Sequence, residues 1–124
     1  MIGFPGNPNG RIIYIIDFGL VREYINPQTQ QHVPMSGGKR VTGTIRYMSC
    51  NGHFNNETSR RDDLESLGYM LLFFLTGNLP WSGMIKLANG NPIVQCQKIG
   101  SIKQALSPEI MFDGYPEVFA NYLK

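Results

Sequence analysis

The sequence feature that most restricts the fold of this chain is a strong helix signal in its middle. From Leu64 to Leu75, leucines recur at three- and four-residue spacing, and tyrosine, methionine and phenylalanine fill positions between them. This spacing predicts one helix over about 59–76. Because apolar residues occupy nearly every side of it from Leu67 onward, the helix is expected to be buried in the middle of its domain.

Both ends of this helix carry matching signals. Ser59 is the expected N-cap, with Thr58 as its rival, because a hydroxyl there can accept a hydrogen bond from a free N–H group of the first turn. Asp62 and Asp63 lie in that first turn, where the positive end of the helix dipole favours carboxylates. Gly77 is suited to the left-handed position that ends a helix.

A second constraint is a run of apolar and β-branched residues near the start of the chain, Ile12–Ile16. A turn rich in proline, glycine and asparagine precedes it, so we expect a short β-hairpin whose second strand is buried on both faces. The run leads directly into Asp17, Phe18 and Gly19. In protein kinases, the aspartate of such an Asp-Phe-Gly motif binds the magnesium ion that bridges the phosphates of ATP. On these three residues alone the alternative is a simple turn, with Asp17 as a turn residue and Gly19 at a positive φ.

The remaining segments predict a largely helical protein with one long surface loop. Residues 26–41 are polar, contain glycine and lack periodicity, which is typical of such a loop. A helix is expected over about 92–99, resuming after Gly100 as far as Leu106. Two short helices are expected to follow, the first after Ser107 and the second after Tyr115.

Several bulky or sulfur-containing side chains are expected in the core. Trp81, the only tryptophan, and the neighbouring pair Phe73 and Phe74 are core residues by type. Cys50 and Cys96 are far apart and match no metal-ligand spacing, so we expect two buried or half-buried free thiols.

Composition and charge argue against several classes of protein. Of the residues, 42% are hydrophobic and 16% are charged, which is ordinary for a soluble globular protein. The net charge of +2 is too small to indicate nucleic-acid binding. The longest apolar stretch, Tyr69–Leu75, is too short to span a membrane, and the first residues do not resemble a signal peptide. We therefore expect a cytoplasmic protein, with a nuclear pool left open.

Three segments together resemble one family of enzymes. Residues 42–51, 59–69 and 77–83 agree in order and spacing with the casein kinase I family of serine/threonine protein kinases. At 49–51 the chain has Ser-Cys-Asn, similar to the Ser-Ile-Asn of that family, where most protein kinases carry Ala-Pro-Glu. The resemblance covers essentially the full length of the chain.

The resemblance implies an α+β, mostly α fold. This would be the C-terminal lobe of a protein kinase, with a short β-hairpin leading into the Asp-Phe-Gly segment and a buried central helix. Residues 1–124 would form a partial kinase domain, running from just after the catalytic loop to within a late helix. The N-terminal lobe and the catalytic loop with its base aspartate have no counterpart in these residues. His32 and His53 lie in the wrong contexts to replace them.

The resemblance also assigns roles to individual residues. Asp17 would bind magnesium and, through it, ATP. Thr44 lies where the activation segment meets the catalytic aspartate, although a hydroxyl that satisfies a local turn is an equal alternative. Asp63 matches the buried helix aspartate that holds the backbone of the catalytic loop. Arg61 is expected to be structural, bonding to loop carbonyls or carboxylates, and Trp81 is expected to be structural as a core residue.

A further implied site binds acidic groups. Lys39 and Arg46 match basic positions of the family, and Gly83 matches a backbone contributor. A guanidinium group suits bidentate binding of phosphate, and the alternative for Arg46 is an ion pair with a core carboxylate. Ser36 stands where many members have an arginine and Gln95 stands where the family has a lysine, so the need for a priming phosphate is left open.

The favoured interpretation is therefore an enzyme of casein kinase I type, which moves the γ-phosphoryl group of ATP to serine or threonine near acidic or phosphorylated residues of protein substrates. Phosphoryl transfer needs the base, the metal ligands and the nucleotide-binding lobe together, so the 124 residues alone are expected to be inactive. The alternatives are a non-catalytic module that holds acidic peptides on Lys39, Arg40 and Arg46, or a truncated relic of a kinase. Apolar surface around Ile12–Phe18 and Tyr122–Leu123 is expected to promote self-association.

Overall fold

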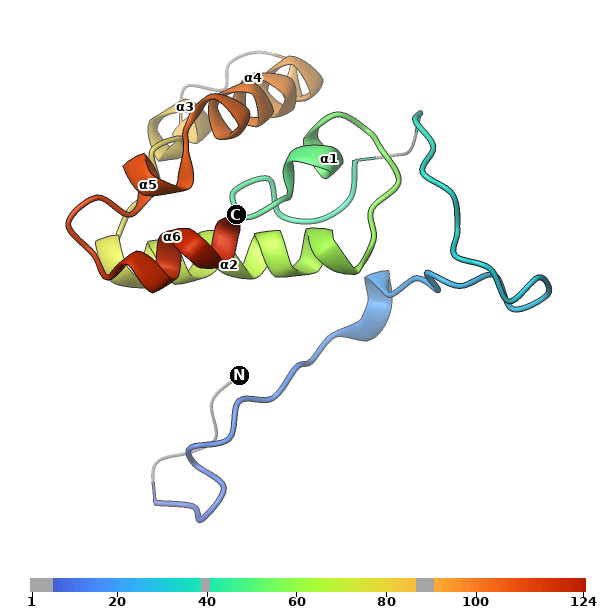
Figure 1. Ribbon diagram of the computed structural model, residues 1–124, viewed down its shortest axis with the longest axis horizontal. Helices are drawn as coiled ribbons and strands as arrows, with labels where there is room; N and C mark the ends of the chain where they lie inside the picture. Colours follow the sequence, from blue (N-terminus) through green and yellow to red (C-terminus); the bar gives the residue numbers. More distant parts are fainter. Residues whose placement is uncertain (1–5, 39–40, 87–90) are drawn as a thin grey trace.

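The computed structural model describes residues 6–38, 41–86 and 91–124, and its regular structure is helical. Figure 1 shows a body of packed helices, with the N-terminal segment running outside it as an extended trace. The elements of the described residues, in chain order, are a 3-10 helix η1 (Phe18–Leu20) and the α-helices α1 (Cys50–His53), α2 (Arg60–Thr76), α3 (Ser82–Lys86), α4 (Pro92–Ala105), α5 (Pro108–Met111) and α6 (Glu117–Leu123).

Helix α2 is the central element that the sequence predicts. It begins after Ser59, whose N–H donates to Asp62 Oδ2 at 2.7 Å as part of a capping box. It ends at Gly77, which has a φ of 72° and whose N–H closes the last turn. Helix α6 packs closely along it, because a Cβ at Gly68 would collide with the side chain of Leu123. The predicted bounds and both predicted caps are therefore confirmed.

The expectation that α2 is buried on nearly every side is wrong. Tyr69 and Leu72 are buried, whereas Leu64 and Phe74 are 57% and 69% exposed. The phenylalanine pair expected in the core is split, because Phe73 is half-buried and Phe74 is exposed. Helices α1 and α6 pack against α2 but do not surround it, so part of its apolar surface has no neighbour among the described residues.

The core forms around two aromatic rings. Trp81 is fully buried, as predicted, and meets Tyr69 edge-on with the ring centroids 5.0 Å apart. The core therefore joins α2 to the helices that follow it. The other buried residues of this cluster are Leu72, Leu79, Ile99, Met111, Phe112 and Ala120.

Helix α4 runs without interruption from Pro92 to Ala105, so the expected break at Gly100 does not occur. The glycine has a packing role instead, because a Cβ there would lie 2.6 Å from the Cβ of His53 on α1. Asn91 caps α4, as the sequence predicts. The two short helices expected near the end of the chain are confirmed as α5, which Ser107 caps, and α6.

The second strand of the predicted β-hairpin is not buried, and residues 1–5, where the first strand is expected, lie outside the described residues. The described residues contain no strand, and the apolar run Ile12–Ile16 is exposed, Ile13 to 76% and Ile15 to 82%. The run lies apart from the helical body (Figure 1), and its side chains are exposed because the helices do not cover them. The expected exposure of apolar surface is confirmed here, since Phe18 is also 67% exposed.

The loop that follows η1 is attached to the start of α2. It folds back on itself through an isolated antiparallel bridge. Arg60 lies over the ring of Tyr24, with Cζ 4.4 Å from the ring centroid. Arg22 Nη1 lies 3.6 Å from Glu57 Oε1. These contacts place the loop beside the residues that precede α2.

Two further expectations concern the thiols and the membrane. Cys50 is half-buried and Cys96 is buried, and both are free thiols, as predicted. Within the part of the chain that the structure describes, no helix combines the length and the apolar character needed to cross a membrane.

Candidate functional site

A groove of about 730 Å³ lies between the N-terminal segment and the start of α2. Its lining includes Asp17, Thr44 and Asp63, which the sequence analysis relates to the catalytic centre of a kinase. They come from the residue before η1, from the loop before α1 and from the first turn of α2. The fold thus brings three candidate residues from distant segments to one groove.

Asp17 begins η1 with a backbone φ of 64°, in the left-handed region. Its Oδ1 accepts a hydrogen bond from the N–H of Gly19 at 3.3 Å. A turn is therefore present, but the positive φ belongs to Asp17 rather than to Gly19. Aspartate adopts this conformation more readily than most residues because its short side chain bonds locally. The turn occupies only Oδ1, so it is compatible with a metal ligand at the same residue.

The carboxylate ligands that the groove offers can be compared with those that magnesium binds in kinases. In kinase sites this ion is bound by one or two carboxylates together with substrate phosphates. Asp17 offers one carboxylate, and Asp63 lines the same groove. Among the described residues, no group of three or more histidine, cysteine, aspartate or glutamate side chains could hold a metal by itself. The residues therefore fit an ion that binds together with phosphates.

The other two candidate residues of the groove are exposed. The carbonyl of Thr44 accepts hydrogen bonds from the N–H groups of Tyr47 and Met48 at 3.0 and 3.1 Å, so the backbone of Thr44 closes the local turn. The buried carboxylate at the start of α2 is Asp62, which is 4% exposed, whereas Asp63 is exposed. Asp63 has no catalytic-loop backbone beside it in the described residues.

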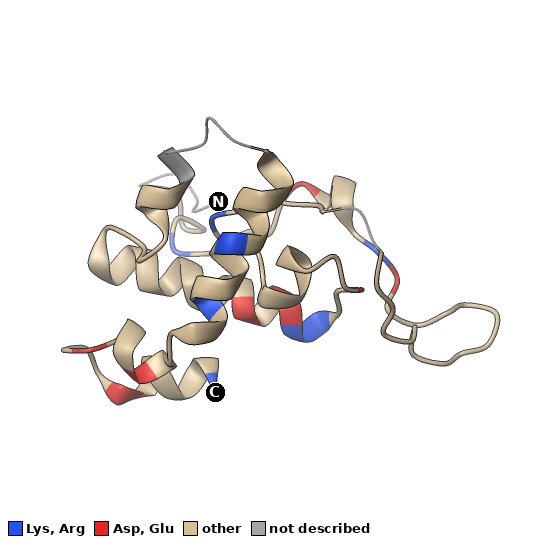
Figure 2. Ribbon diagram, turned by 90° about the horizontal axis from the view of Figure 1, so that it is seen from above, with Lys and Arg blue, Asp and Glu red and all other residues tan. Residues whose placement is uncertain are grey.

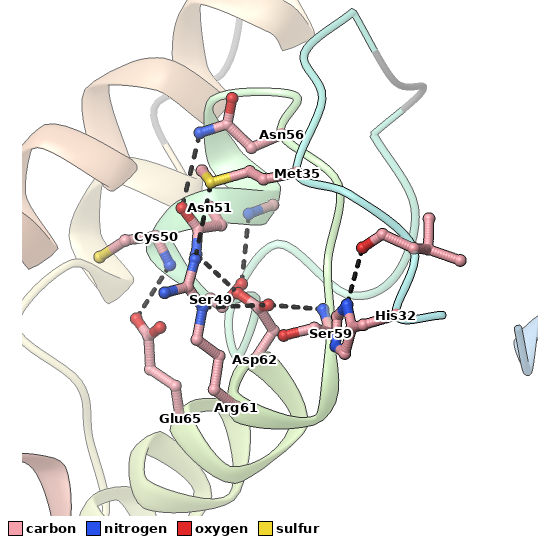
Figure 3. A network of polar contacts seen from close by, with 12 residues as sticks. His32, Met35, Ser49, Cys50, Asn51, Asn56, Ser59, Arg61, Asp62 and Glu65 are labelled. Carbon is pink, nitrogen blue, oxygen red and sulfur yellow. Dashed lines mark hydrogen bonds and ion pairs between the residues drawn. The ribbon is translucent and has the colours of Figure 1, made fainter. Parts of the chain in front are cut away.

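Asp62 is the centre of a polar network that joins α1 to α2 (Figure 3). Its Oδ1 accepts from Asn51 Nδ2 at 3.1 Å, and its Oδ2 accepts from the N–H of Ser59 at 2.7 Å. Arg61 Nε lies 3.9 Å from the same Oδ2, and its Nη2 lies 3.9 Å from Met35 Sδ. Arg61 thus contacts both a carboxylate and the loop that precedes α1.

Arg46 lies beside Trp81, which directly precedes helix α3 and its Gly83. The carbonyl of Arg46 accepts from Trp81 Nε1 at 2.8 Å, which ties the two segments together. The guanidinium Cζ lies 5.7 Å from the ring centroid of Phe73, and no described carboxylate is within ion-pair distance of it. The alternative of an ion pair with a core carboxylate is therefore not found here. Lys39, the other basic residue predicted for this site, lies outside the described residues.

Basic residues do not gather on one element of the described chain. Figure 2 shows lysine and arginine spread over several elements, with acidic residues among them. Gln95, at the position of a family lysine, donates through Nε2 to the carbonyl of Met84 at 2.8 Å. An anion site near Arg46 would therefore depend on few charges.

Comparison with known proteins identifies the family. No family model matches the chain. Casein kinase I homolog 2 of Schizosaccharomyces pombe is 44% identical over 123 residues, which cover 99% of this chain. Casein kinase I homolog 3 of Saccharomyces cerevisiae is 46% identical over 120 residues, and Casein kinase I homolog RAG8 of Kluyveromyces lactis is 41% identical over 124.

The chain is homologous to casein kinase I. The resemblance drawn from its motifs is therefore confirmed, and the relatives are kinases. The matches cover 95% or more of this chain but only 28%, 22% and 23% of the three relatives. The chain thus spans about a quarter of the length of the proteins that it matches.

One residue of this casein kinase I homologue that the sequence analysis missed is Lys103, which is 2% exposed. Its Nζ donates to the carbonyls of Met48 at 2.5 Å and Arg46 at 3.3 Å. The same atom lies 4.4 and 4.6 Å from the ring centroids of Tyr69 and Trp81. Burial lowers the pKa of Lys103 to about 7.

A sequence signal for this lysine does exist. Lys103 follows Cys96, Ile99 and Gly100 at helical spacing, and all four residues are buried on α4. A lysine in register with an apolar stripe is unusual, because lysine is almost never fully buried. The sequence does not reveal its partners, which come from a loop far away in the chain.

Glu65 was missed as well. Its Oε1 accepts from the hydroxyl of Tyr69 at 2.6 Å and from the N–H of Cys50 at 2.9 Å. Burial raises the pKa of the Cys50 thiol to about 11. This cysteine therefore stays protonated near neutral pH and does not act as a nucleophile.

His53 is buried. Its Nδ1 lies 3.2 Å from Cys96 Sγ, and its Nε2 has no hydrogen-bond partner among the described residues. Burial, with a smaller contribution from the nearby Lys103 ammonium, lowers the pKa of His53 to about 4. The imidazole is therefore neutral under ordinary conditions.

Proposed function

We propose that this casein kinase I homologue contributes part of the catalytic unit of a serine/threonine protein kinase. That kinase transfers the γ-phosphoryl group of ATP to serine or threonine near acidic or phosphorylated residues. The observation that carries the proposal is the meeting of Asp17, Thr44 and Asp63 at one groove, in a chain that is 41–46% identical to casein kinase I proteins over nearly its full length.

Asp17 is the proposed magnesium ligand of this unit. Its Oδ1 is fixed by the N–H of Gly19, which limits the rotation of the carboxylate. A bound magnesium ion would neutralise charge on the phosphates of ATP. Asp63 lines the same groove, where its carboxylate is available to hold the backbone of a neighbouring segment.

Arg46 is the proposed contact for acidic substrates, together with Lys39 and the backbone of Gly83. The guanidinium of Arg46 rests on Phe73 and has no carboxylate partner among the described residues. An arginine whose charge is not neutralised inside the protein is suited to bind a phosphate or carboxylate of another molecule.

The 124 residues by themselves are proposed to be inactive. They include one metal ligand of the kinase motif, Asp17, but no His-Arg-Asp segment that would supply the base. Without the base and the nucleotide-binding lobe, the groups that position ATP and the acceptor hydroxyl are missing.

A chimera tests this function. The chain replaces the matching segment of Casein kinase I homolog 3 of Saccharomyces cerevisiae, with which it is 46% identical over 120 residues. The chimera is expected to phosphorylate an acidic peptide with magnesium and ATP, whereas the chain alone does not. Asp17→Asn in the chimera is expected to lower kcat by about 100-fold or more, because charge neutralisation at the phosphates is lost.

A matched substitution controls for the loss of one negative charge. Asp113 is an exposed aspartate outside the groove, and Asp113→Asn is expected to leave kcat unchanged within about twofold. A folded chimera without activity, or one that tolerates Asp17→Asn as well as Asp113→Asn, contradicts the proposed function.

A further inference from the structure

Lys103 is the only buried lysine or arginine among the described residues. Removing an ammonium group from water is costly unless other groups compensate the charge. No carboxylate lies within ion-pair distance of its Nζ in the described part of the chain. The compensation must therefore come from neutral groups.

Two carbonyl oxygens and two aromatic rings provide this compensation. The carbonyls belong to Arg46 and Met48, on either side of a single residue, and the rings belong to Tyr69 and Trp81. Carbonyl dipoles and the negative faces of aromatic rings both stabilise a cation. The ammonium thereby joins α4 to the loop before α1 and to the core.

The titratable groups around the ammonium come from each neighbouring helix. Glu65 and Tyr69 lie on α2, Cys50 and His53 lie on α1, and Cys96 lies on α4 itself. Burial holds the pKa of Cys50 at about 11 and that of His53 at about 4, so neither group changes charge near neutral pH. Burial also raises the pKa values of Cys96 and Tyr69.

The backbone of Arg46 is held at one atom by two donors. Its carbonyl oxygen accepts from Trp81 Nε1 at 2.8 Å and from Lys103 Nζ at 3.3 Å. The second contact of Lys103, to the carbonyl of Met48, fixes the chain two residues further on. With both carbonyls fixed, the Cα of Arg46 has a set position from which its side chain extends over Phe73.

We propose that Lys103 is a positioning residue of the acidic-substrate site, whose ammonium holds the carbonyls of Arg46 and Met48 and so sets where Arg46 presents its guanidinium. The inference rests on the proposed function, because that function gives Arg46 its role. Lys103 itself is buried and does not touch the substrate.

The first experiment examines the contact itself in the 124-residue chain. Trp81 is the only tryptophan, and Lys103 Nζ lies 4.6 Å from its ring centroid, so its fluorescence reports the charge of the ammonium. The emission is expected to titrate with a midpoint near pH 7 in the wild type. This transition is expected to be absent in Lys103→Met and Lys103→Arg and retained in Lys98→Met, which removes an exposed lysine of the same helix.

The second experiment measures binding of a serine peptide flanked by aspartates to the same chain. At pH 6, Lys103→Met is expected to weaken binding by about tenfold, whereas Lys103→Arg retains most of it. Wild-type affinity is expected to fall as the pH rises through about 7, because the ammonium loses its proton. The affinity of Lys103→Arg is expected to stay constant over the same range, because arginine does not titrate there.

Several results would overturn the inference. Lys103→Met could bind the peptide as tightly as the wild type, or Lys98→Met could lose as much affinity as Lys103→Met. Lys103→Arg could lose as much affinity as Lys103→Met, or the wild type could bind no peptide. A merely structural role lowers the melting temperature but produces no pH dependence of affinity that arginine removes. If the chimera is active but peptide binding does not depend on Lys103, this inference alone is refuted. If the chimera is inactive but the chain shows the expected binding pattern, the proposed function alone is refuted.

Discussion

The N-terminal segment and the helical body both contain apolar residues, but the two parts bury them to different degrees. In residues 6–38, the run Ile12–Ile16 is exposed and forms no strand. In the helical body, residues of the same kind pack around Trp81, and Leu72 and Ile99 are fully buried. In Figure 1 the N-terminal segment is an extended trace beside a bundle of helices.

The difference shows that apolar residues indicate burial only where a partner exists to bury them. Helix α2 satisfies its backbone within itself, so it needs only packing neighbours on one side. The side chains of a strand are buried only where another layer covers them, and Ile12–Ile16 is exposed. The motif aspartate Asp17 directly follows that run. Its position therefore depends on the exposed N-terminal segment rather than on the helical body.

The largest expected effect contrasts a core residue with one of the exposed run. Trp81→Ala should lower the free energy of unfolding by about 3–5 kcal/mol, because it removes a fully buried ring and its hydrogen bond to Arg46. Ile15→Ala, at a residue that is 82% exposed, should change it by less than about 0.5 kcal/mol. Urea unfolding followed by far-ultraviolet circular dichroism measures both. A comparable loss in the two variants would mean that the run is buried in solution.

The next effect is the loss of stability in acid. The pKa of His53 is about 4 in the folded chain and 6.5 ordinarily, so the unfolded chain binds its proton first. Stability should therefore fall by roughly 3 kcal/mol between pH 6.5 and 4, at about 1.4 kcal/mol for each pKa unit. Urea unfolding across this range is expected to show the slope in the wild type and in His32→Gln, an exposed control, but not in His53→Gln. If the stability of His53→Gln shows the same dependence on pH, groups other than His53 cause the loss of stability in acid.

The smallest effect concerns the end of α2. Gly77 has a φ of 72°, which an alanine adopts only with strain, so Gly77→Ala should cost about 1 kcal/mol of stability. Gly83→Ala is the matched control, because its φ is not in the left-handed region and a Cβ there meets no atom within 4 Å. Thermal melts of the two variants test this contrast. Equal melting temperatures would show that the helix end does not depend on its glycine.

Local signals of the helical body were predictable from the sequence. The N-cap Ser59, the terminal Gly77 and the caps of the last helices follow from rules that involve only a few neighbouring residues. Trp81 was predictable as a core residue because of its type and its place in a turn. The roles predicted for Asp17 and Thr44 come from the family resemblance instead, and the fold brings both residues to one groove.

Features that depend on distant partners were not predictable. The run Ile12–Ile16 has the composition of a buried strand, but composition does not say whether another layer of the protein covers it. Lys103 is stabilised by carbonyls of Arg46 and Met48, which no helical spacing reveals. Phe74 shows the same limit, because its exposure depends on which side of α2 the other helices cover.

The amide hydrogen-exchange rate of Ile15 and Ile16 most directly tests whether the position of Asp17 depends on a backbone partner for the two residues that precede it. In the chain alone the amides of Ile15 and Ile16 should exchange about as fast as in an unstructured peptide, while those of α2 are protected. In the chimera with Casein kinase I homolog 3, the same amides should slow by about 100-fold or more, as the run gains hydrogen bonds. Fast exchange of Ile15 and Ile16 in an active chimera would contradict this dependence, as would strong protection of the same two amides in the chain alone.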